Sequence, residues 1–472
     1  MRYAGEMPIV GATHHTTVSV RARLALGATL VWTALTGCST YFPINARLVA
    51  WNPSAGYREL RHVSGAERSD DLLLMVAFSG GGTRAASFAY GVLEELAATP
   101  VEIGGRRRRL LDEVDLISGV SGGSVTAAYY GLYGDRIFTD FERRFLRRNV
   151  QLGMFLQILL PQNWFRLYSA YFDRSELAAE YFDDYVFDGA TFHDLDRPDR
   201  PRILINATDL LSGDRFGFTQ EQFDFICSDL ASFPVSRAVA ASSAVPVIFS
   251  PVTLWNYAGK CSFRSPAWLE ASLRDDQGSI RRRVAARSLI SYLDARRRRF
   301  IHLVDGGISD NLGVRGLTSR LLLERYSGET LESEGWNSVR EIVVIVVNAE
   351  TAPDPSWSLR DFAPPLAAVL DWVTSAQISR YNVETTELLQ AELERVTAAL
   401  SARGHPVHFH LVEVSFAGVT DERERRRLAS TPTSFSLRAK TVDKLRQVGL
   451  QLLHDSAELR TVLAELTALP PR

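Results

Sequence analysis

Short apolar runs and helical segments alternate along the first three quarters of the chain. Continuous apolar runs, the pattern of strands buried on both faces, occupy residues 72–78, 114–117, 202–207, 300–304 and 341–347. A shorter strand is expected at 214–219, and helical periodicity covers 85–98, 124–133 and 237–244. Strands that alternate with helices in this way predict an α/β fold with a mostly parallel sheet flanked by helices.

The pattern changes after residue 350. Residues 366–402 and 441–469 are largely helical, and residues 408–414 are expected to form an edge strand. We therefore predict a main domain over residues 72–350 and a mainly helical C-terminal extension over residues 351–472. The charged, helical segment 268–299 lies between two predicted strands and is interpreted as an insertion, which would serve as a lid, as a membrane interface or as a plain elaboration.

The N-terminus has the pattern of an export signal. Arg21 and Arg23 precede an apolar run over residues 24–35, and Thr36, Gly37 and Cys38 follow directly. The run is too short for a membrane span, which needs about 20 residues. The Leu-Thr-Gly-Cys sequence resembles the lipobox of bacterial lipoproteins, in which the cysteine is lipidated. We expect a signal peptide over residues 1–37, a tether over residues 38–71, and a membrane-anchored protein of a bacterial envelope, periplasmic or at the outer membrane. An uncleaved anchor or a chance match are the alternatives.

The composition excludes some classes of partner. Hydrophobic residues make up 46% and charged residues 23% of the chain, and the net charge is −2. Because nucleic-acid-binding domains usually carry a clear basic excess, we expect no nucleic-acid partner. The arginine runs at 106–109, 281–283, 296–299 and 425–427 are interpreted as solvated faces, with attraction of one run to anionic lipid as the alternative.

The cysteines do not suggest a metal site. Once Cys38 is assigned to lipidation, Cys227 and Cys261 remain, and in an exported protein they either pair as a disulfide or stay as two buried thiols. The three cysteines form no metal-ligand pattern, and neither HxxxH nor HExxH occurs in the sequence.

One serine lies in a motif typical of nucleophiles. The sequence Gly119-Val120-Ser121-Gly122-Gly123 fits G-x-S-x-G and falls between a predicted strand and a predicted helix. A nucleophilic serine needs a sharp turn that lifts its hydroxyl out of the sheet, and the neighbouring glycines tolerate such a turn. The N-terminus of the following helix would favour negative charge developing at this point.

A second strand-to-helix turn is rich in glycine. It contains Gly80, Gly81 and Gly82, followed by Arg84. Successive glycines expose backbone N–H groups, which is what an oxyanion hole requires. A competing interpretation exists, because the spacing of Gly80, Gly82 and Ala85 also matches the dinucleotide fingerprint G-x-G-x-x-G/A, with Glu102 at a suitable distance for a ribose contact.

A third turn carries an aspartate at the end of a predicted strand. Asp305 is followed by Gly306 and Gly307, and the turn continues to Asn311. An Asp-Gly-Gly sequence is in most cases simply a turn. Combined with the two other turns, however, Asp305 would supply the base that a serine nucleophile needs.

Together these motifs resemble the patatin-like phospholipase family. The resemblance also includes Arg237 to Pro246, followed by Phe249-Ser250-Pro251, and it covers residues 72 to 347 with the motifs in the family's order. It implies a patatin-like α/β/α fold, Ser121 as nucleophile and Asp305 as base of a Ser–Asp dyad, and an oxyanion hole formed by the backbone near Gly80, Gly81, Gly82 and Gly122. Arg84 would organise this loop or meet a phosphate.

The histidines fit a dyad, since none of the nine lies in a motif. His302 falls inside a predicted strand and is expected to be a packed core residue. His405, His408 and His410 cluster near the edge strand, but no carboxylate or cysteine partner is evident, and we therefore expect no metal. We also expect no organic cofactor.

The resulting prediction is a lipid-anchored serine acyl hydrolase that cleaves carboxylic esters of lipids or phospholipids through an acyl-enzyme on Ser121. One alternative is an inactive, membrane-tethered lipid-binding or scaffold protein, which the presence of both Ser121 and Asp305 disfavours. The other is a dinucleotide-binding oxidoreductase that uses Gly80–Ala85. The sequence does not indicate which lipid is cleaved, or whether water or another alcohol accepts the acyl group.

Overall fold

The computed structural model describes residues 45–58, 68–169, 172–246, 248–275, 279–316, 338–352, 358–402, 404 and 406–470. The predicted signal peptide, residues 1–37, and Cys38 lie outside the described residues. Among the described helices, none is both long enough and apolar enough to span a bilayer.

A central eight-stranded sheet organises the described part of the chain, with the strand order β12-β11-β2-β5-β6-β10-β9 and β7 paired with β6. The strands from β12 to β6 are parallel, whereas β10 is antiparallel to both β6 and β9. Their bounds are β2 (Leu72–Phe78), β5 (Val114–Val120), β6 (Arg202–Asp209), β7 (Arg215–Gly217), β9 (Val252–Trp255), β10 (Phe300–Asp305), β11 (Glu341–Asn348) and β12 (His408–Ser415). The predicted, mostly parallel sheet is confirmed.

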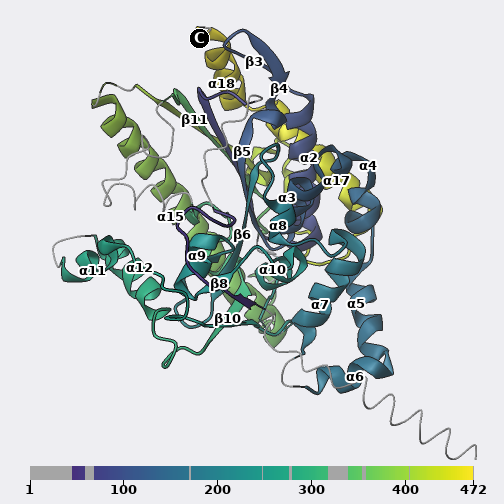
Figure 1. The fold of residues 1–472 in the computed structure, drawn as a ribbon. Helices are drawn as coiled ribbons and strands as arrows, with labels where there is room; N and C mark the ends of the chain where they lie inside the picture. Colours follow the sequence, from purple (N-terminus) through teal and green to yellow (C-terminus); the bar gives the residue numbers. More distant parts are fainter. Residues whose placement is uncertain are drawn as a thin grey trace, which may run out of the picture.

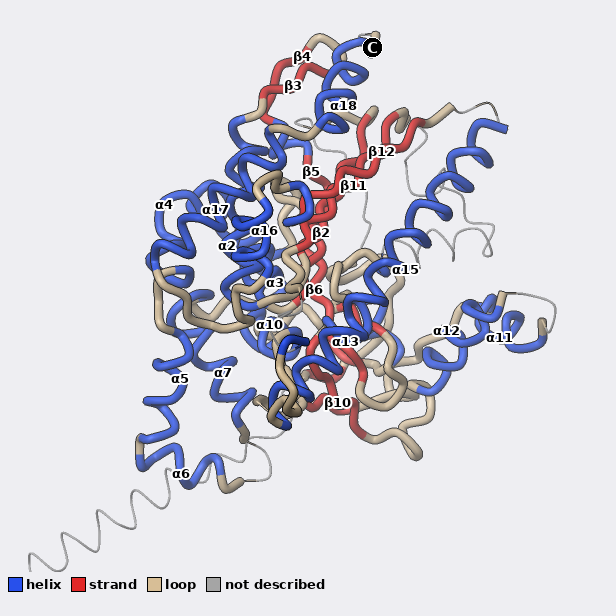
Figure 2. The backbone as a smooth tube through the Cα atoms, turned by 180° about the vertical axis from the view of Figure 1, so that it is seen from behind, coloured by secondary structure: helices blue, strands red, loops and turns tan. Residues whose placement is uncertain are grey.

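Two hydrophobic cores lie on the two faces of this sheet. Alternate residues of a strand point to opposite faces, so Leu74 and Val76 of β2 enter one core while Leu73 and Met75 enter the other. Figure 2 shows helices on both sides of the red strands. The first face is covered by α2 (Gly82–Ala98), α3 (Gly122–Tyr133), α10 (Val235–Ser242) and α17 (Ala439–His454), and the second by α15 (Leu366–Ala402). Burial on both faces explains why the central strands are uninterrupted apolar runs.

The remaining elements are shorter. They are β1 (Ala46–Arg47), the hairpin β3 (Pro100–Ile103) and β4 (Arg106–Arg109), α4 (Ile137–Phe141), α5 (Val150–Leu159), α6 (Pro161–Leu167), α7 (Arg174–Phe182), α8 (Phe192–Leu195), α9 (Gln220–Phe225), β8 (Ser228–Asp229), α11 (Ala267–Arg274), α12 (Ile280–Ser291), α13 (Gly307–Asp310), α16 (Glu422–Ala429) and α18 (Ala457–Ala468). Helices α11 and α12 form the predicted insertion and project from one side of the domain (Figure 1).

The C-terminal region is built into the domain. Strand β12 forms an edge of the sheet next to β11, and α17 packs along α2 (Figure 1). The two helices approach closely, because a Cβ atom on Gly91 would lie 1.9 Å from the carbonyl oxygen of Arg446, and one on Gly449 would lie 2.3 Å from that of Phe88. Residues 351–472 are therefore more than an appended helical extension, since they complete both the sheet and one of its cores.

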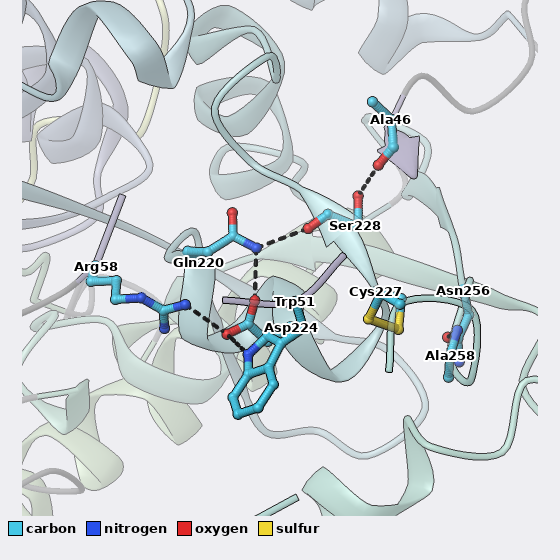
Figure 3. The surroundings of a disulfide bond; sticks show 10 residues. Ala46, Trp51, Arg58, Gln220, Asp224, Cys227, Ser228, Asn256 and Ala258 are labelled. Carbon is cyan, nitrogen blue, oxygen red and sulfur yellow. Dashed lines mark hydrogen bonds and ion pairs between the residues drawn. A yellow bond between two sulfur atoms is a disulfide. The ribbon is translucent and has the colours of Figure 1, made fainter. Parts of the chain in front are cut away.

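Part of the predicted tether is also folded onto the domain. Strand β1 pairs with β8, and the Trp51 N–H donates to the carbonyl oxygen of Cys261. Figure 3 shows this region around the disulfide that joins Cys227 to Cys261, whose Cα atoms are 5.4 Å apart. The Trp51 indole also donates to Asp224. Residues 45–58 thus belong to the folded domain, because backbone pairing and the partly buried Trp51 indole hold them in place.

We expect Gly91→Ala to disrupt the contact between α2 and α17. Alanine normally favours a helix over glycine by about 0.5–1 kcal/mol, but here the added methyl group meets the Arg446 carbonyl. Overpacking of this kind should lower the free energy of unfolding by about 1–3 kcal/mol in urea titrations. Gly418→Ala is the control, because its nearest neighbour is the end of the flexible Leu452 side chain at 3.0 Å. Equal stability of the two variants would contradict this packing.

Candidate active site

Two neighbouring strand-to-helix turns form the centre of the site. Strand β2 leads into α2 through Gly81, and β5 leads into α3 through Ser121. Ser121 has a φ of 50°, in the left-handed region that L-residues rarely occupy. Such backbone strain costs about 1–3 kcal/mol and is concentrated at functional sites. The side chain is buried beside the turn, with the residue only 3% exposed.

The two turns touch each other directly. A Cβ atom on Gly122 would lie 1.9 Å from the carbonyl oxygen of Gly82, and one on Gly123 would lie 2.6 Å from that of Ser79. Only glycine permits this approach, because any side chain at Gly122 would separate the turns. Gly119, the first glycine of the serine motif, lies at the end of β5 with Ser124 packed against it.

The contact brings the N-termini of α2 and α3 together. Gly82 and Gly122 are the first residues of these helices, so their N–H groups have no acceptor within their own helices. The neighbouring N–H groups are engaged, since Gly80 donates to the Asn311 carbonyl and Thr83 to the Ser434 carbonyl. Two aligned helix dipoles and adjacent N–H groups form a suitable environment for an oxyanion.

Arg84 is a buried residue that organises the glycine-rich turn. Its Nε donates to the carbonyl oxygen of Ala349 at 2.7 Å, and its Nη1 donates to that of Thr431 at 2.7 Å. The residue is 3% exposed. Of the two roles expected for Arg84, these contacts favour organising the loop over binding a phosphate.

A segment near the C-terminus completes the glycine-rich turn. Ser434 forms a parallel bridge with Gly82 and accepts the Thr83 N–H at 2.8 Å. The Thr433 hydroxyl accepts from Arg84 at 3.1 Å. Sequence reasoning missed this segment, because a short polar stretch more than 300 residues from the turn carries no motif.

Asp305 faces Ser121 from the end of β10. Its Oδ1 accepts the Gly307 N–H at 2.8 Å, while its buried Oδ2 has no hydrogen-bond partner among the described residues. Burial raises the pKa of the Asp305 carboxyl to about 6, and the N–H of Gly307 and the hydroxyl of Ser121 oppose this rise. The hydroxyl is therefore close to the carboxyl, although no hydrogen bond within 3.5 Å joins these two groups.

The C-terminal end of α10 joins the nucleophile turn to the base turn. The Ser242 hydroxyl accepts the Ser121 N–H at 2.8 Å and donates to the carbonyl oxygen of Asn206 at 2.6 Å. The Ser242 carbonyl accepts the Gly306 N–H at 3.1 Å. The segment that contains Ser242 was recognised from the sequence, but the bridging role of this serine was not.

The loop after Asp305 is fixed by buried polar contacts. A Cβ atom on Gly306 would lie 2.2 Å from the carbonyl oxygen of Asn206, so the loop packs directly on β6. The Asp310 carboxylate accepts the backbone N–H groups of Gly313, Val314 and Arg315. This loop therefore places the Asp305 carboxyl rigidly beside the serine turn.

The prediction that His302 is a core residue is wrong. Its side chain is exposed, and Nδ1 lies 2.9 Å from the hydroxyl of Thr253. His302 and Asp305 are three positions apart on β10, so they point to opposite faces of the strand. His302 is consequently not positioned between Asp305 and Ser121.

A histidine–carboxylate cluster lies at the other end of the sheet. Glu341, His410 and Glu465 place their ligand atoms within 4.8 Å of one another. Hydrogen bonding to Glu341 raises the pKa of His410, which favours an ion pair in this cluster. The sequence indicated no carboxylate partner because both glutamates are distant in the chain. Glu341 begins β11, whereas Ser121 follows the carboxyl end of β5, so the cluster is separate from the serine site.

The glycine-rich turn lacks the surroundings of a dinucleotide site. Glu102 lies exposed in the β3–β4 hairpin, paired with Arg107, and not at the end of a neighbouring parallel strand. The turn itself is covered by Ser434 and Gly122. These contacts leave the backbone of Gly80–Ala85 facing the serine turn.

The chain is similar to known proteins. A family model described as patatin-like phospholipase matches residues 76–318, just over half of the chain. No curated protein matches. Among solved structures, human GIVD cytosolic phospholipase A2 is 11% identical with a TM-score of 0.43, covering 84% of this chain and 62% of that chain. Its complex with methyl gamma-linolenyl fluorophosphonate and terbium chloride is 14% identical with a TM-score of 0.38, covering 84% and 60%. The chain thus spans about three fifths of these structures.

Asp305→Asn should stabilise the fold at neutral pH. Because the pKa of Asp305 is raised on folding, the folded state binds the proton more tightly, and stability decreases as pH rises from about 4 to about 6. Asparagine is uncharged, so the variant avoids burying a charged carboxylate. Relative to the parent protein, its free energy of unfolding should be higher by about 1–3 kcal/mol at pH 7 and unchanged below pH 4. Urea titrations across pH would measure the difference. Asp310→Asn is the contrast. Burial raises the pKa of Asp310 as well, but both of its carboxylate oxygens accept backbone N–H groups, so the amide nitrogen of asparagine would face one of these donors and should destabilise the fold.

Proposed function

The chain belongs to the patatin-like phospholipase family, a family of lipid acyl hydrolases, and on that basis we propose that Ser121 and Asp305 form the dyad that cleaves a carboxylic ester of a lipid or phospholipid. The observation that carries this proposal is that a serine in a left-handed turn lies near a buried carboxylate oxygen, Asp305 Oδ2, which has no hydrogen-bond partner in the part of the chain that the structure describes. Water as acyl acceptor makes the reaction a hydrolysis.

In the first step, Asp305 Oδ2 takes the proton of the Ser121 hydroxyl as the serine oxygen attacks the ester carbonyl carbon. The carbonyl oxygen becomes an oxyanion, which accepts from the N–H groups near Gly81, Gly82 and Gly122. Collapse of this intermediate breaks the bond to the alcohol, and Asp305 returns its proton to the leaving oxygen. The acyl group is then esterified to Ser121.

In the second step, Asp305 takes a proton from a water molecule that attacks the acyl-enzyme. The oxyanion forms again in the same position, the bond to Ser121 breaks, and the serine oxygen recovers its proton from Asp305. A fatty acid is released. The raised pKa of Asp305 suits this role, because a base with a pKa near the working pH accepts and returns a proton efficiently.

The same proposal extends to the location of the protein. Cys38 follows an apolar run and the Leu-Thr-Gly sequence, and we infer that it is lipidated and anchors the domain to a membrane of a bacterial envelope. Several acyl chains would anchor firmly, since each buried CH₂ contributes about 0.8 kcal/mol. Such an anchor would hold the site close to its lipid substrate.

Ser121→Ala and Asp305→Asn should both abolish ester hydrolysis while leaving the protein folded. We expect kcat/KM to fall about 10⁴–10⁶-fold without the nucleophile and about 10²–10⁴-fold without the base. In the parent protein, kcat/KM should rise about tenfold per pH unit below about pH 6 and level off above it, because only the ionised Asp305 is a base. Short-chain, long-chain and diacyl phospholipid esters are the substrates to compare.

Two results would count against this dyad. Activity of Asp305→Asn with loss of activity in Ser121→Ala would mean that another residue is the base. A folded parent protein that hydrolyses none of the esters would favour a lipid-binding role instead.

Lipidation of Cys38 predicts a mass increase and membrane association. Protein expressed with its own N-terminus in a bacterium should carry acyl chains on Cys38, detectable by mass spectrometry of the N-terminal peptide. Cys38→Ser should release most of the protein from the membrane fraction. Equal membrane association of an unacylated protein would show that the anchor is of another kind.

A further inference from the structure

Helices α5 and α6 expose an unusual number of large apolar side chains. Buried Val150 and Met154 face the domain, whereas positions three and four apart along the other side of α5 face outward. Among the exposed apolar residues, Phe165 is 81% and Tyr168 is 95% exposed. We call the following set the α5–α6 apolar surface: Leu152, Phe155, Leu159, Trp164, Phe165 and Tyr168.

This surface differs from the rest of the exterior in its charge. A helix at the surface of a soluble protein normally directs its apolar stripe inward and its charged residues outward. Residues 149–169 contain no acidic residue, and Arg166 is the single charged one. That arginine pairs with Glu180 and stacks over the Phe172 ring. The outward face of α5 and α6 is therefore apolar without charges to solvate it.

The α5–α6 apolar surface begins beside the active site. Gln151, in the first turn of α5, accepts a hydrogen bond from the Ser434 hydroxyl at 3.1 Å. Ser434 in turn accepts the Thr83 N–H of the oxyanion turn. Figures 1 and 2 both show α5 and α6 projecting beyond the body of the domain at the end where α10 lies. The α5–α6 apolar surface therefore extends outward from a point beside the site.

We propose that the α5–α6 apolar surface docks into the boundary between headgroups and acyl chains of a phospholipid bilayer. Tryptophan and tyrosine prefer this boundary, and leucine and phenylalanine enter the adjoining acyl region. Exposed Arg148 lies at the start of the helix pair and stacks over Tyr185, in position to meet lipid phosphates. The proposal rests on the proposed function, because docking here would hold the glycine-rich turn, which lies next to the start of α5, close to the lipid surface.

The first test measures binding to vesicles of phosphatidylethanolamine and phosphatidylglycerol without any turnover. The full chain carries Cys38→Ala and Ser121→Ala, and it is compared with the same chain bearing Phe155→Ser, Leu159→Ser and Phe165→Ser. The matched control bears Val49→Ser, Val373→Ser and Val383→Ser, which are equally exposed but lie elsewhere. We expect the vesicle-bound fraction to fall at least tenfold for the surface variant and to stay within twofold for the control.

A second measurement reports whether the α5–α6 apolar surface enters the bilayer, from the emission of a fluorophore attached to it. A fluorophore on Phe165→Cys should shift to the blue when vesicles are added, whereas one on Val383→Cys should not. Equal vesicle binding by all variants together with no shift at Phe165→Cys would overturn the proposal. The proposal would also be overturned if the variant with Phe155→Ser, Leu159→Ser and Phe165→Ser kept its vesicle binding but lost self-association or binding to another protein. The α5–α6 apolar surface would then be a protein interface.

Catalysis separates this inference from the proposed function. In chains with Ser121 intact, the surface variant should lose at least tenfold in hydrolysis of vesicle phospholipid and keep its turnover of a soluble short-chain ester within twofold. If the parent hydrolyses no ester yet binds vesicles through this surface, the function fails and the docking stands. If the surface variant loses as much turnover of the soluble ester as of vesicle phospholipid, α5 and α6 support the site itself and the docking proposal fails.

Discussion

The site depends on the contact between two backbone turns. A side chain at Gly122 would collide with the Gly82 carbonyl, and a side chain at Gly82 would collide with the backbone of Ser434. This contact requires β2 and β5 to be neighbours in a parallel sheet, because only then do their helices begin at the same edge. It also requires support from outside the turns, which the buried Arg84 and the Ser434 carbonyl provide. The strain at Ser121 persists because these surroundings fix it.

Much of this arrangement could be predicted from the sequence. Apolar runs such as 341–347 identified the strands, since strands covered on both faces need no polar alternation. The turns that hold Gly80–Gly82 and Ser121 follow β2 and β5, and neighbouring parallel strands end at the same edge of a sheet. The position of Asp305 did not follow from this rule, because β10 is antiparallel to β6. The structure brings these turns together, so that burial raises the pKa of Asp305 while the nearby Ser121 hydroxyl opposes this rise.

The rest could not be predicted, because it depends on contacts between distant segments without motifs. Ser242 joins two turns, since its hydroxyl accepts the Ser121 N–H and its carbonyl oxygen accepts the Gly306 N–H. Ser434 covers the glycine-rich turn from a polar stretch near the C-terminus. His302 resembled a core residue in a strand, but which face of β10 is buried depends on the packing of the sheet. In the same way, Glu341 and Glu465 meet His410 only because β12 lies between β11 and α18 in the fold.

The bridge from Ser434 to Gly82 also links the site to the order in which the chain is made. All the motif residues, from Gly80 to Asp305, leave the ribosome before this segment does. Until Ser434 has emerged, the Thr83 N–H lacks its acceptor and Arg84 lacks the Thr431 carbonyl. A nascent chain would therefore hold Ser121 before the glycine-rich turn is complete, and this turn acquires its last contacts only when the C-terminal segment has been made.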